Sequence, residues 1–129
     1  MPRRSQADPA RIAAYRRGLS AETLAAWLLR AKLYRILARR YRTPAGEIDV
    51  IARRGRTIAF VEVKTRPSEA QALEAVGATA RRRIARAAEL WFAAHPGAAG
   101  FDLRFDLVVV VPGRMPRHIA AVFDAEGRL

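Results

Sequence analysis

Two acidic residues and a lysine stand inside runs of the sequence that alternate between apolar and polar residues. The run 46–53 carries Asp49, and the run 57–65 carries Glu62 and Lys64. Such alternation is typical of β-strands, in which residues two apart point to the same face of the sheet. Carboxylates and an ammonium group gathered on one face can together hold a divalent cation and a phosphate group.

The turn between the two runs decides whether these side chains meet. Gly55 and Arg56 suit a two-residue hairpin turn of the Gly-X kind, and that turn places Asp49 directly opposite Glu62. A four-residue loop preserves this register, whereas a three-residue loop shifts the pairing by one residue and sends Asp49 to the other face. The hydrophobic pattern fits either face, so the prediction depends on the turn.

In the favoured register the two carboxylates lie about 5 Å apart at Cβ, where like charges destabilise the sheet and raise one carboxyl pKa. A divalent cation removes this conflict. Asp49, Glu62 and the backbone carbonyl of Val63 would then supply part of the shell of Mg²⁺ or Mn²⁺, and water and a scissile phosphate would complete it. Water bound to such an ion attacks a phosphate more readily near neutral pH.

Lysine is rare in this chain, so its positions are informative. The sequence has 22 Arg and only 2 Lys, at Lys32 and Lys64. An ammonium group can release a proton where a guanidinium group cannot, which gives a reason for lysine beside Glu62. Glu47 opposes Lys64 in the same register. The alternative is an ordinary ion pair on a solvated strand face, which the apolar residues around Glu62 disfavour.

The length of 129 residues suits one domain, and the net charge of +12 favours polyanionic partners, nucleic acid before an acidic membrane surface. The excess of arginine and alanine is also what a GC-rich genome produces, so charge alone leaves both explanations open. The absence of cysteine excludes disulfides and thiol chemistry. No apolar run approaches about 18 residues and no secretory signal is visible, so we expect a cytoplasmic protein that does not enter the membrane.

The elements expected around the hairpin follow the order α-β-β-β-α-β, with a short tail element. Ser20 is a good N-cap for the first helix, and Trp27 and Trp91 lie on apolar stripes that we expect in the core. His95 is expected to cap the end of its helix. We expect a loosely ordered basic segment over 1–18, one domain over 19–129, an edge or half-exposed strand over 34–42, a partly helical loop over 66–78, a helix over 79–94, a buried strand over 103–111, and a strand or helix over 118–123.

Several short segments resemble one family. The segments 46–51 (Gly-Glu-Ile-Asp-Val-Ile) and 60–66 (Phe-Val-Glu-Val-Lys-Thr-Arg), together with Arg104-Phe105-Asp106 and the spacing of Gly18 and Glu22, resemble the YraN-type family of small bacterial proteins. That family is similar to the PD-(D/E)xK nuclease superfamily and is described as a predicted endonuclease distantly related to archaeal Holliday junction resolvases. The resemblance implies an α/β fold with a restriction-endonuclease-like αβββαβ core, in which helices flank a mixed central sheet.

The resemblance also implies roles for single residues. Asp49 matches the aspartate of the superfamily motif, Glu62 its second acid and Lys64 its lysine, which makes these three the expected catalytic residues. Glu22 matches a position that supplies a further metal ligand in some relatives, beside the alternative of a solvated helix residue. Glu47 would support Lys64. The implied function is Mg²⁺- or Mn²⁺-dependent hydrolysis of DNA phosphodiester bonds, with branched or damaged DNA as candidate substrates.

Arginines on the second long helix are the expected DNA contacts, because that helix should flank the catalytic face. They are Arg81, Arg82, Arg83 and Arg86, and they would position the duplex through its phosphates without reading its sequence. Ala80-Arg81 stands where the family often shows Lys-Gln. Two alternatives remain: a nucleic-acid-binding module that keeps a nuclease scaffold without turnover, and a basic adaptor for an acidic protein. A homodimer is expected only by analogy with other nucleases.

Overall fold

The computed structural model describes residues 20–129, so the segment predicted to be loosely ordered, 1–18, lies outside the described residues. The predicted order of elements is confirmed, and the tail element is a strand. The elements are α2 (Ala21–Ala31), β1 (Arg35–Thr43), β2 (Gly46–Arg54), β3 (Thr57–Thr65), α3 (Glu69–Glu74), α4 (Ala78–Ala94), the 3₁₀ helix η2 (Pro96–Ala98), β4 (Asp102–Val110) and β5 (Arg117–Phe123).

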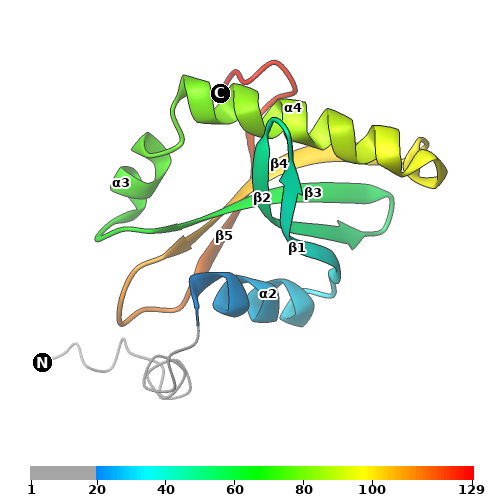
Figure 1. Cartoon of the computed structure of the whole chain (residues 1–129). Coiled ribbons are helices and arrows are strands. Elements are labelled where there is room, and N and C mark those ends of the chain that lie inside the picture. Colours follow the sequence, from blue (N-terminus) through cyan, green and yellow to red (C-terminus); the bar gives the residue numbers. More distant parts are fainter. Residues whose placement is uncertain (1–19) are drawn as a thin grey trace, which may run out of the picture.

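The strands form one five-stranded sheet in the order β1-β2-β3-β4-β5. β3 and β4 are parallel, while the other neighbours are antiparallel, which makes the sheet mixed. α3 and α4 cover one face and α2 covers the other (Figure 1). The strand predicted at an edge is β1, and the buried run Val108-Val109-Val110 lies in β4 beside the central strand β3. The expected α/β architecture is therefore present.

Two apolar clusters hold the layers together. On the α4 side, Phe60 and Phe105 of the sheet pack with Ile84 and Trp91 of the helix, as the predicted stripe of α4 requires. Trp91 is 4% exposed, which confirms its prediction as a core residue. On the α2 side lies a smaller cluster of mostly aliphatic side chains, which includes Leu24, Leu29, Val61 and Val108.

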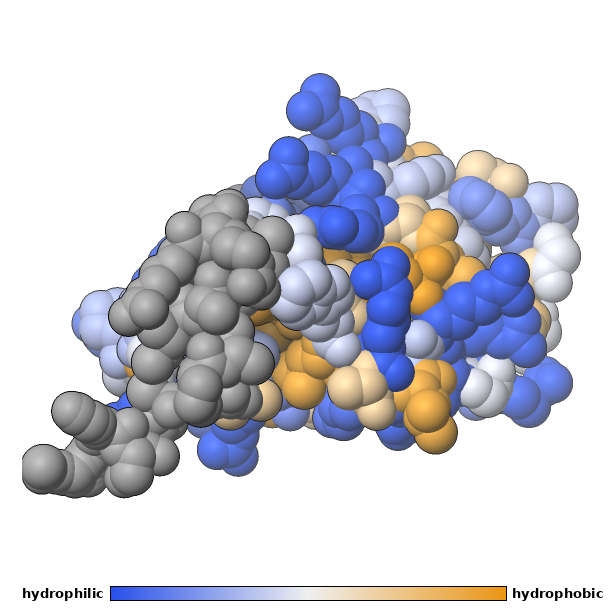
Figure 2. Space-filling view, turned by 90° about the horizontal axis from the view of Figure 1, so that it is seen from below, coloured by the Kyte–Doolittle hydropathy of each residue, from blue (hydrophilic) through white to orange (hydrophobic). Residues whose placement is uncertain are grey.

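The prediction for Trp27 is wrong, because its side chain is 47% exposed. Ser20 caps α2 as expected, but the helix turns Leu24, Ala25 and Leu29 toward the sheet instead of the stripe through Trp27. A small residue such as Ala25 lets a helix approach the strands closely, and a tryptophan at that contact would hold them apart. The α2 side of the molecule shows hydrophobic areas among hydrophilic side chains (Figure 2).

The β2–β3 hairpin has the predicted register. Arg54 pairs with Thr57 across a two-residue turn of Gly55 and Arg56, and the pairs continue in step to Val50 and Val61. Gly55 has φ +61, a left-handed conformation that glycine adopts without a steric cost. The turn chemistry was therefore a sound basis for choosing between the registers.

β2 departs from regular alternation one residue beyond this ladder. Ile48 packs into the α4 cluster and Val50 into the α2 cluster, although residues two apart in a regular strand share a face. On the neighbouring strand, Arg40 has φ +51, which is unusual for a residue with a side chain. The β1–β2 hairpin thereby bends away from β3 and stands upright against α4 (Figure 1). Asp49 lies at this break.

Candidate functional site

Asp49 occupies the gap that opens where β2 leaves β3. The Oδ2 atom of Asp49 accepts a hydrogen bond from the backbone amide of Val63 at 2.8 Å. A side chain thus takes the place of the strand partner that Val63 would otherwise find on β2. This bond fixes the orientation of the carboxylate between the two strands, beside Glu62.

The environment of Asp49 favours its protonated form. Loss of hydration, followed by the negative charge of Glu62, raises the pKa of Asp49 to about 7. The Val63 amide opposes this shift because it stabilises the ionised carboxylate, and the charge of Glu22 adds a smaller increase. The neighbouring carboxylate thus makes ionisation of Asp49 unfavourable near neutral pH, a conflict that a bound cation would relieve.

Glu62 and Lys64 form the second part of the site. Glu62 is 6% exposed, and its Oε2 atom lies 3.0 Å from the Nζ atom of Lys64. A carboxylate so deeply buried needs such a partner, since burying an unpaired charge is strongly destabilising. The side chain of Lys64 is 21% exposed, so Lys64 is the member of this ion pair that reaches the solvent.

Glu22 approaches the same place from α2. Its Oε1 atom accepts a hydrogen bond from Arg40 at 3.1 Å. The pKa of Arg40 is raised, first by this bond and the charge of Glu22 and to a smaller extent by Glu47 and Asp49. Arg40 therefore lies among several acids, and the left-handed backbone at this residue places it there. Sequence reasoning missed Arg40 as part of the site.

Glu47 does not have the arrangement that we predicted. A regular ladder would have placed it opposite Lys64, but the ladder recorded between β2 and β3 stops at Val50. The Oε2 atom of Glu47 instead accepts a hydrogen bond from Arg42 at 3.2 Å, while Lys64 pairs with Glu62. The bend of β2 is the physical reason for the difference, because it carries Glu47 away from β3.

The acids that meet here form a pair. No group of three or more His, Cys, Asp or Glu residues within residues 20–129 is placed to hold a metal ion by itself. Asp49 and Glu62 are adjacent, and Glu22 is engaged by Arg40. Two carboxylates can still hold Mg²⁺, which often takes one or two protein carboxylates and completes its shell with water and phosphate oxygens. The donor set therefore fits a cation that is shared with a substrate.

The four arginines of α4 are not equivalent. Arg81 donates to the carbonyl oxygens of Gly127 at 2.6 Å and Val76 at 2.7 Å, so it ties the C-terminal segment to the start of α4. The other three, Arg82, Arg83 and Arg86, are exposed. Their charges remain available to an anionic partner, although Arg86 also pairs with Glu89 at 2.8 Å.

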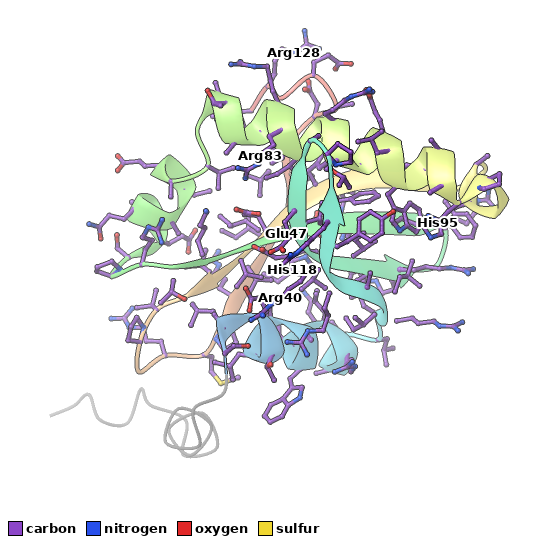
Figure 3. The ribbon with its side chains drawn as sticks, in the orientation of Figure 1. Arg40, Glu47, Arg83, His95, His118 and Arg128 are labelled. Atoms are coloured by element: carbon purple, nitrogen blue, oxygen red, sulfur yellow. The ribbon has the colours of Figure 1, made fainter. Side chains whose placement is uncertain are left out.

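Arg83 lies closest to the β1–β2 hairpin. Gly46, at the tip of this hairpin, has φ +145, and a Cβ atom there would lie 2.6 Å from Cδ of Arg83. The side chain of Arg83 therefore passes directly over the glycine. Figure 3 shows Arg83 above Glu47 and Arg40 below it, on the same side of the hairpin. The glycine allows the arginine to reach the side of the sheet on which the acids lie.

A second polar cluster was not predicted from the sequence. Asp106 is 1% exposed, and it accepts hydrogen bonds from Arg104 at 2.7 and 2.8 Å and from the Ala121 amide at 3.0 Å. Its Oδ2 atom also lies 2.7 Å from Nε2 of His118, whose Nδ1 lies 2.7 Å from Nζ of Lys32. Because an ammonium group only donates, Nδ1 accepts and Nε2 carries the proton that Asp106 binds.

This cluster has a structural role. The hydrogen bonds lower the pKa of Asp106 to about 2, against the opposing effect of burial. The contacts of Asp106 and His118 join β4, β5 and the end of α2. For His118 and Lys32 the sequence offered no sign of contact, because 86 residues separate them.

A mixed sheet with helices on both faces, and a pair of acids beside a lysine at the break in one hairpin, place this chain among α/β proteins with a restriction-endonuclease-like core. The model of the uncharacterised protein family UPF0102 matches residues 21–110. The chain belongs to this family, which is the YraN-type family that the sequence resembles. Because this family is uncharacterised, membership in it assigns neither an activity nor a nuclease superfamily to the chain.

Relatives in several bacteria support the same assignment. The chain is 56% identical over 119 residues to a UPF0102 protein of Bradyrhizobium diazoefficiens. The aligned residues are 92% of this chain and 90% of that protein. It is 55% identical over 117 residues to a UPF0102 protein of Rhodopseudomonas palustris, with 91% of each chain covered. A UPF0102 protein of a Chelativorans species is 52% identical over 121 residues, which are 94% of this chain and 98% of that one.

Among residues 20–129, none of the helices is both long and apolar enough to cross a bilayer.

Proposed function

We propose that this protein is a metal-dependent endonuclease of the PD-(D/E)xK type that hydrolyses phosphodiester bonds of DNA. The observation that carries the proposal is the buried pair of carboxylates, Asp49 and Glu62, with the Lys64 ammonium group 3.0 Å from Glu62. The pKa of Asp49 is raised beside Glu62, and strongly perturbed groups concentrate at functional sites.

Asp49 and Glu62 would hold the ion, Mg²⁺ or Mn²⁺, with the Val63 carbonyl as a further candidate ligand. The ion, when bound, would supply an activated water molecule and neutralise charge on the phosphate. Glu22 would enter this set only if it left Arg40, to which it is bonded at 3.1 Å.

The protein's own groups would orient and charge the site. The Val63 amide holds the Asp49 carboxylate in one direction, so the carboxylate loses little freedom when it binds a ligand. Lys64 pairs with Glu62 and would present donors to a phosphate oxygen, and an ammonium group, unlike a guanidinium group, can give up a proton. Arg82, Arg83 and Arg86 would bind phosphates of the same duplex and position it without reading bases.

A second function has one observation in its favour. The acids of the described chain form a pair and not a group of three, and a nuclease scaffold with too few ligands could bind nucleic acid without cleaving it. In that case the net charge of +12 would provide affinity, and no metal would be taken up. The two functions differ in their dependence on the acids and on divalent ions.

The test is cleavage of defined DNA by the purified full-length chain in Mg²⁺ and in Mn²⁺. The substrates are a duplex, a nicked duplex and a four-way junction of equal length. We expect cleavage that EDTA abolishes and that Asp49→Asn, Glu62→Gln and Lys64→Met each reduce by about 10² or more. Glu126→Gln is the matched control, because it removes one carboxylate charge from an exposed C-terminal residue.

The outcomes separate the two functions. Activity that survives in Asp49→Asn would come from a contaminating nuclease and would contradict the proposal. Tight DNA binding by every variant, without cleavage and without heat of metal binding in calorimetry, would establish the binding module instead.

A further inference from the structure

A groove of about 580 Å³ lies on the side of the β1–β2 hairpin that faces away from the acid pair. Its walls come from β1, the end of α4 and the segment around η2, and Ile58 of β3 forms part of its surface. Figure 3 shows His95, one of its residues, across the hairpin from Glu47. This volume falls within the range of known ligand pockets, about 300–1,000 Å³.

Aromatic rings dominate one side of the groove. His95 stacks on Trp91 with ring centres 4.2 Å apart, and Tyr41 meets His95 edge-on at 6.3 Å. The Nδ1 atom of His95 donates to the carbonyl oxygen of Trp91 at 2.7 Å, which makes Nε2 the acceptor of the neutral ring. His95 is exposed, so this ring and its acceptor nitrogen face an incoming ligand.

Arg53 lines the groove, and Arg56 lies beside it, near the same aromatic ring. The Arg53 guanidinium lies 4.3 Å from the ring centre of Phe101, and that of Arg56 lies 5.8 Å from the same ring. Arg53 also donates to the carbonyl of Gly55, and Arg56 to that of Gly100. These acceptors are neutral, and within residues 20–129 no salt bridge compensates the charge of either arginine.

The positive charges of Arg53 and Arg56 favour some ligands of the groove over others. A second copy of this chain carries +12, so its approach to Arg53 and Arg56 would be repulsive unless acidic residues met them. An apolar peptide would use the rings but would gain nothing from the arginines. An unpaired nucleotide uses both, because bases stack on aromatic rings and on guanidinium planes while the phosphate binds the cations.

We propose that this groove binds an unpaired nucleotide from a single-stranded part of the nucleic acid that the protein acts on. The inference rests on the proposed function for its partner class and adds a subsite to it. Ile58 of the groove and Glu62 of the acid pair lie on the same strand, four residues and about 13 Å apart. Because the groove and the acid pair lie on opposite sides of the β1–β2 hairpin, a strand that occupies both passes around the hairpin and covers more than this direct distance.

Tryptophan fluorescence can report on the groove directly. The chain has two tryptophans, and Trp27→Phe leaves Trp91 as the single reporter, within the groove. This protein is titrated with a 12-nucleotide oligothymidylate in EDTA, and with an abasic oligomer of equal length that has the same phosphates and no bases. We expect quenching of Trp91 by oligothymidylate, and affinity for the abasic oligomer that is lower by roughly 5- to 100-fold.

Two variants test the groove itself. Phe101→Ala should weaken oligothymidylate binding by roughly 5- to 100-fold. Gly97→Leu should give a comparable loss without touching the core, because a Cβ atom at Gly97 would have no neighbour within 4 Å and a leucine would narrow the groove. Leu73→Ala, which removes an exposed apolar side chain from α3, is the matched control and should bind like the parent.

Several results would overturn the inference. Equal affinity for the two oligomers, together with unchanged binding by Gly97→Leu, would show that charge alone attracts the strand. Trp91 emission that changes with protein concentration in the absence of DNA would assign the groove to a second copy of the chain.

The fluorescence titration of the groove and the cleavage assay of the proposed function give independent answers. Because the titration contains no metal, Asp49→Asn should quench normally. If the protein does not cleave DNA but Trp91 is quenched, the groove is supported and the nuclease function is contradicted. If the protein cleaves DNA but Trp91 does not respond, the nuclease function is supported and the groove is contradicted.

Discussion

The Asp49 carboxylate accepts the Val63 amide at 2.8 Å at the point where the β2–β3 ladder has ended. One hydrogen bond therefore performs two functions: it satisfies a backbone donor that the bend of β2 leaves without a strand partner, and it holds an acid against Glu62. The separation of the strands and the raised pKa of Asp49 have a common origin, since both follow from bringing this side chain into the gap.

Replacing Asp49 with asparagine should stabilise the metal-free protein above neutral pH. The pKa of Asp49 is about 7 in the folded protein, against 3.8 for an unperturbed aspartate, so ionisation costs folding free energy as pH rises from about 4 to 7. The asparagine side chain can still accept the Val63 amide but carries no charge. At pH 8 in EDTA we expect Asp49→Asn to raise the free energy of unfolding by on the order of 1 to 2 kcal/mol, discounted for the partly solvated site.

Urea unfolding at pH 8 and at pH 4 measures this difference, which should vanish at the lower pH. Mn²⁺ should then raise the melting temperature of the wild-type protein at pH 8 and leave that of Asp49→Asn unchanged. Equal responses of the two proteins to Mn²⁺ would exclude Asp49 as a ligand.

Substitutions of Lys64 should distinguish charge from proton transfer. Lys64→Arg keeps the positive charge beside Glu62, whereas Lys64→Met removes it and leaves a buried carboxylate unpaired. If the ammonium group moves a proton, both variants should lose about 10²-fold or more in cleavage rate, measured in single-turnover reactions at saturating DNA. Near-normal cleavage by Lys64→Arg would limit the role of Lys64 to electrostatics.

Turn chemistry and alternation were enough to predict the hairpin, its register and the meeting of Asp49 with Glu62. The departure of Glu47 from its predicted position could not be foreseen, because the bend of β2 depends on its packing against α4 and on the left-handed backbone at Arg40. Regular alternation is a local property, and it fails where a strand leaves its neighbour.

The two lysines illustrate the same limit. Lys64 was correctly related to Glu62, two residues away on one strand, because the geometry of a strand is known in advance. For Lys32 the sequence indicated no partner, although its ammonium group lies 2.7 Å from His118, which is 86 residues further along the chain. Contacts between distant segments follow from the assembled layers, and a single sequence does not reveal them.

The Asp106 cluster should set the acid stability of the fold. The pKa of Asp106 is lowered to about 2 from a reference of 3.8, so its contribution to stability is present above about pH 4 and is lost as pH falls through 2. We expect this loss to amount to about 2 kcal/mol. Asp106→Asn should remove it at every pH and cost about 3–5 kcal/mol, because Arg104 and His118 lose the negative charge and one of the two acceptor oxygens of this buried carboxylate.

Chemical unfolding between pH 2 and pH 7 tests this expectation for both proteins. The wild-type curve should fall toward the variant's as the pH approaches 2. Parallel curves would show that the charge of Asp106 has no net effect on folding.

The arginines of α4 should separate into one that supports the fold and others that bind DNA. Arg81→Gln removes the charged donors to Gly127 and Val76, so we expect it to lower the free energy of unfolding by about 1–3 kcal/mol. Arg82→Gln and Arg83→Gln should leave stability nearly unchanged, and each should reduce the slope of log affinity against log salt by about 1, as expected for one phosphate contact.

Duplex binding measured by anisotropy over a several-fold range of salt concentration provides the slopes, and thermal melting provides the stabilities. A lower slope in Arg81→Gln at full stability, with none in the other two variants, would reverse the assignment, and DNA would then have to approach α4 from the side of the C-terminal segment.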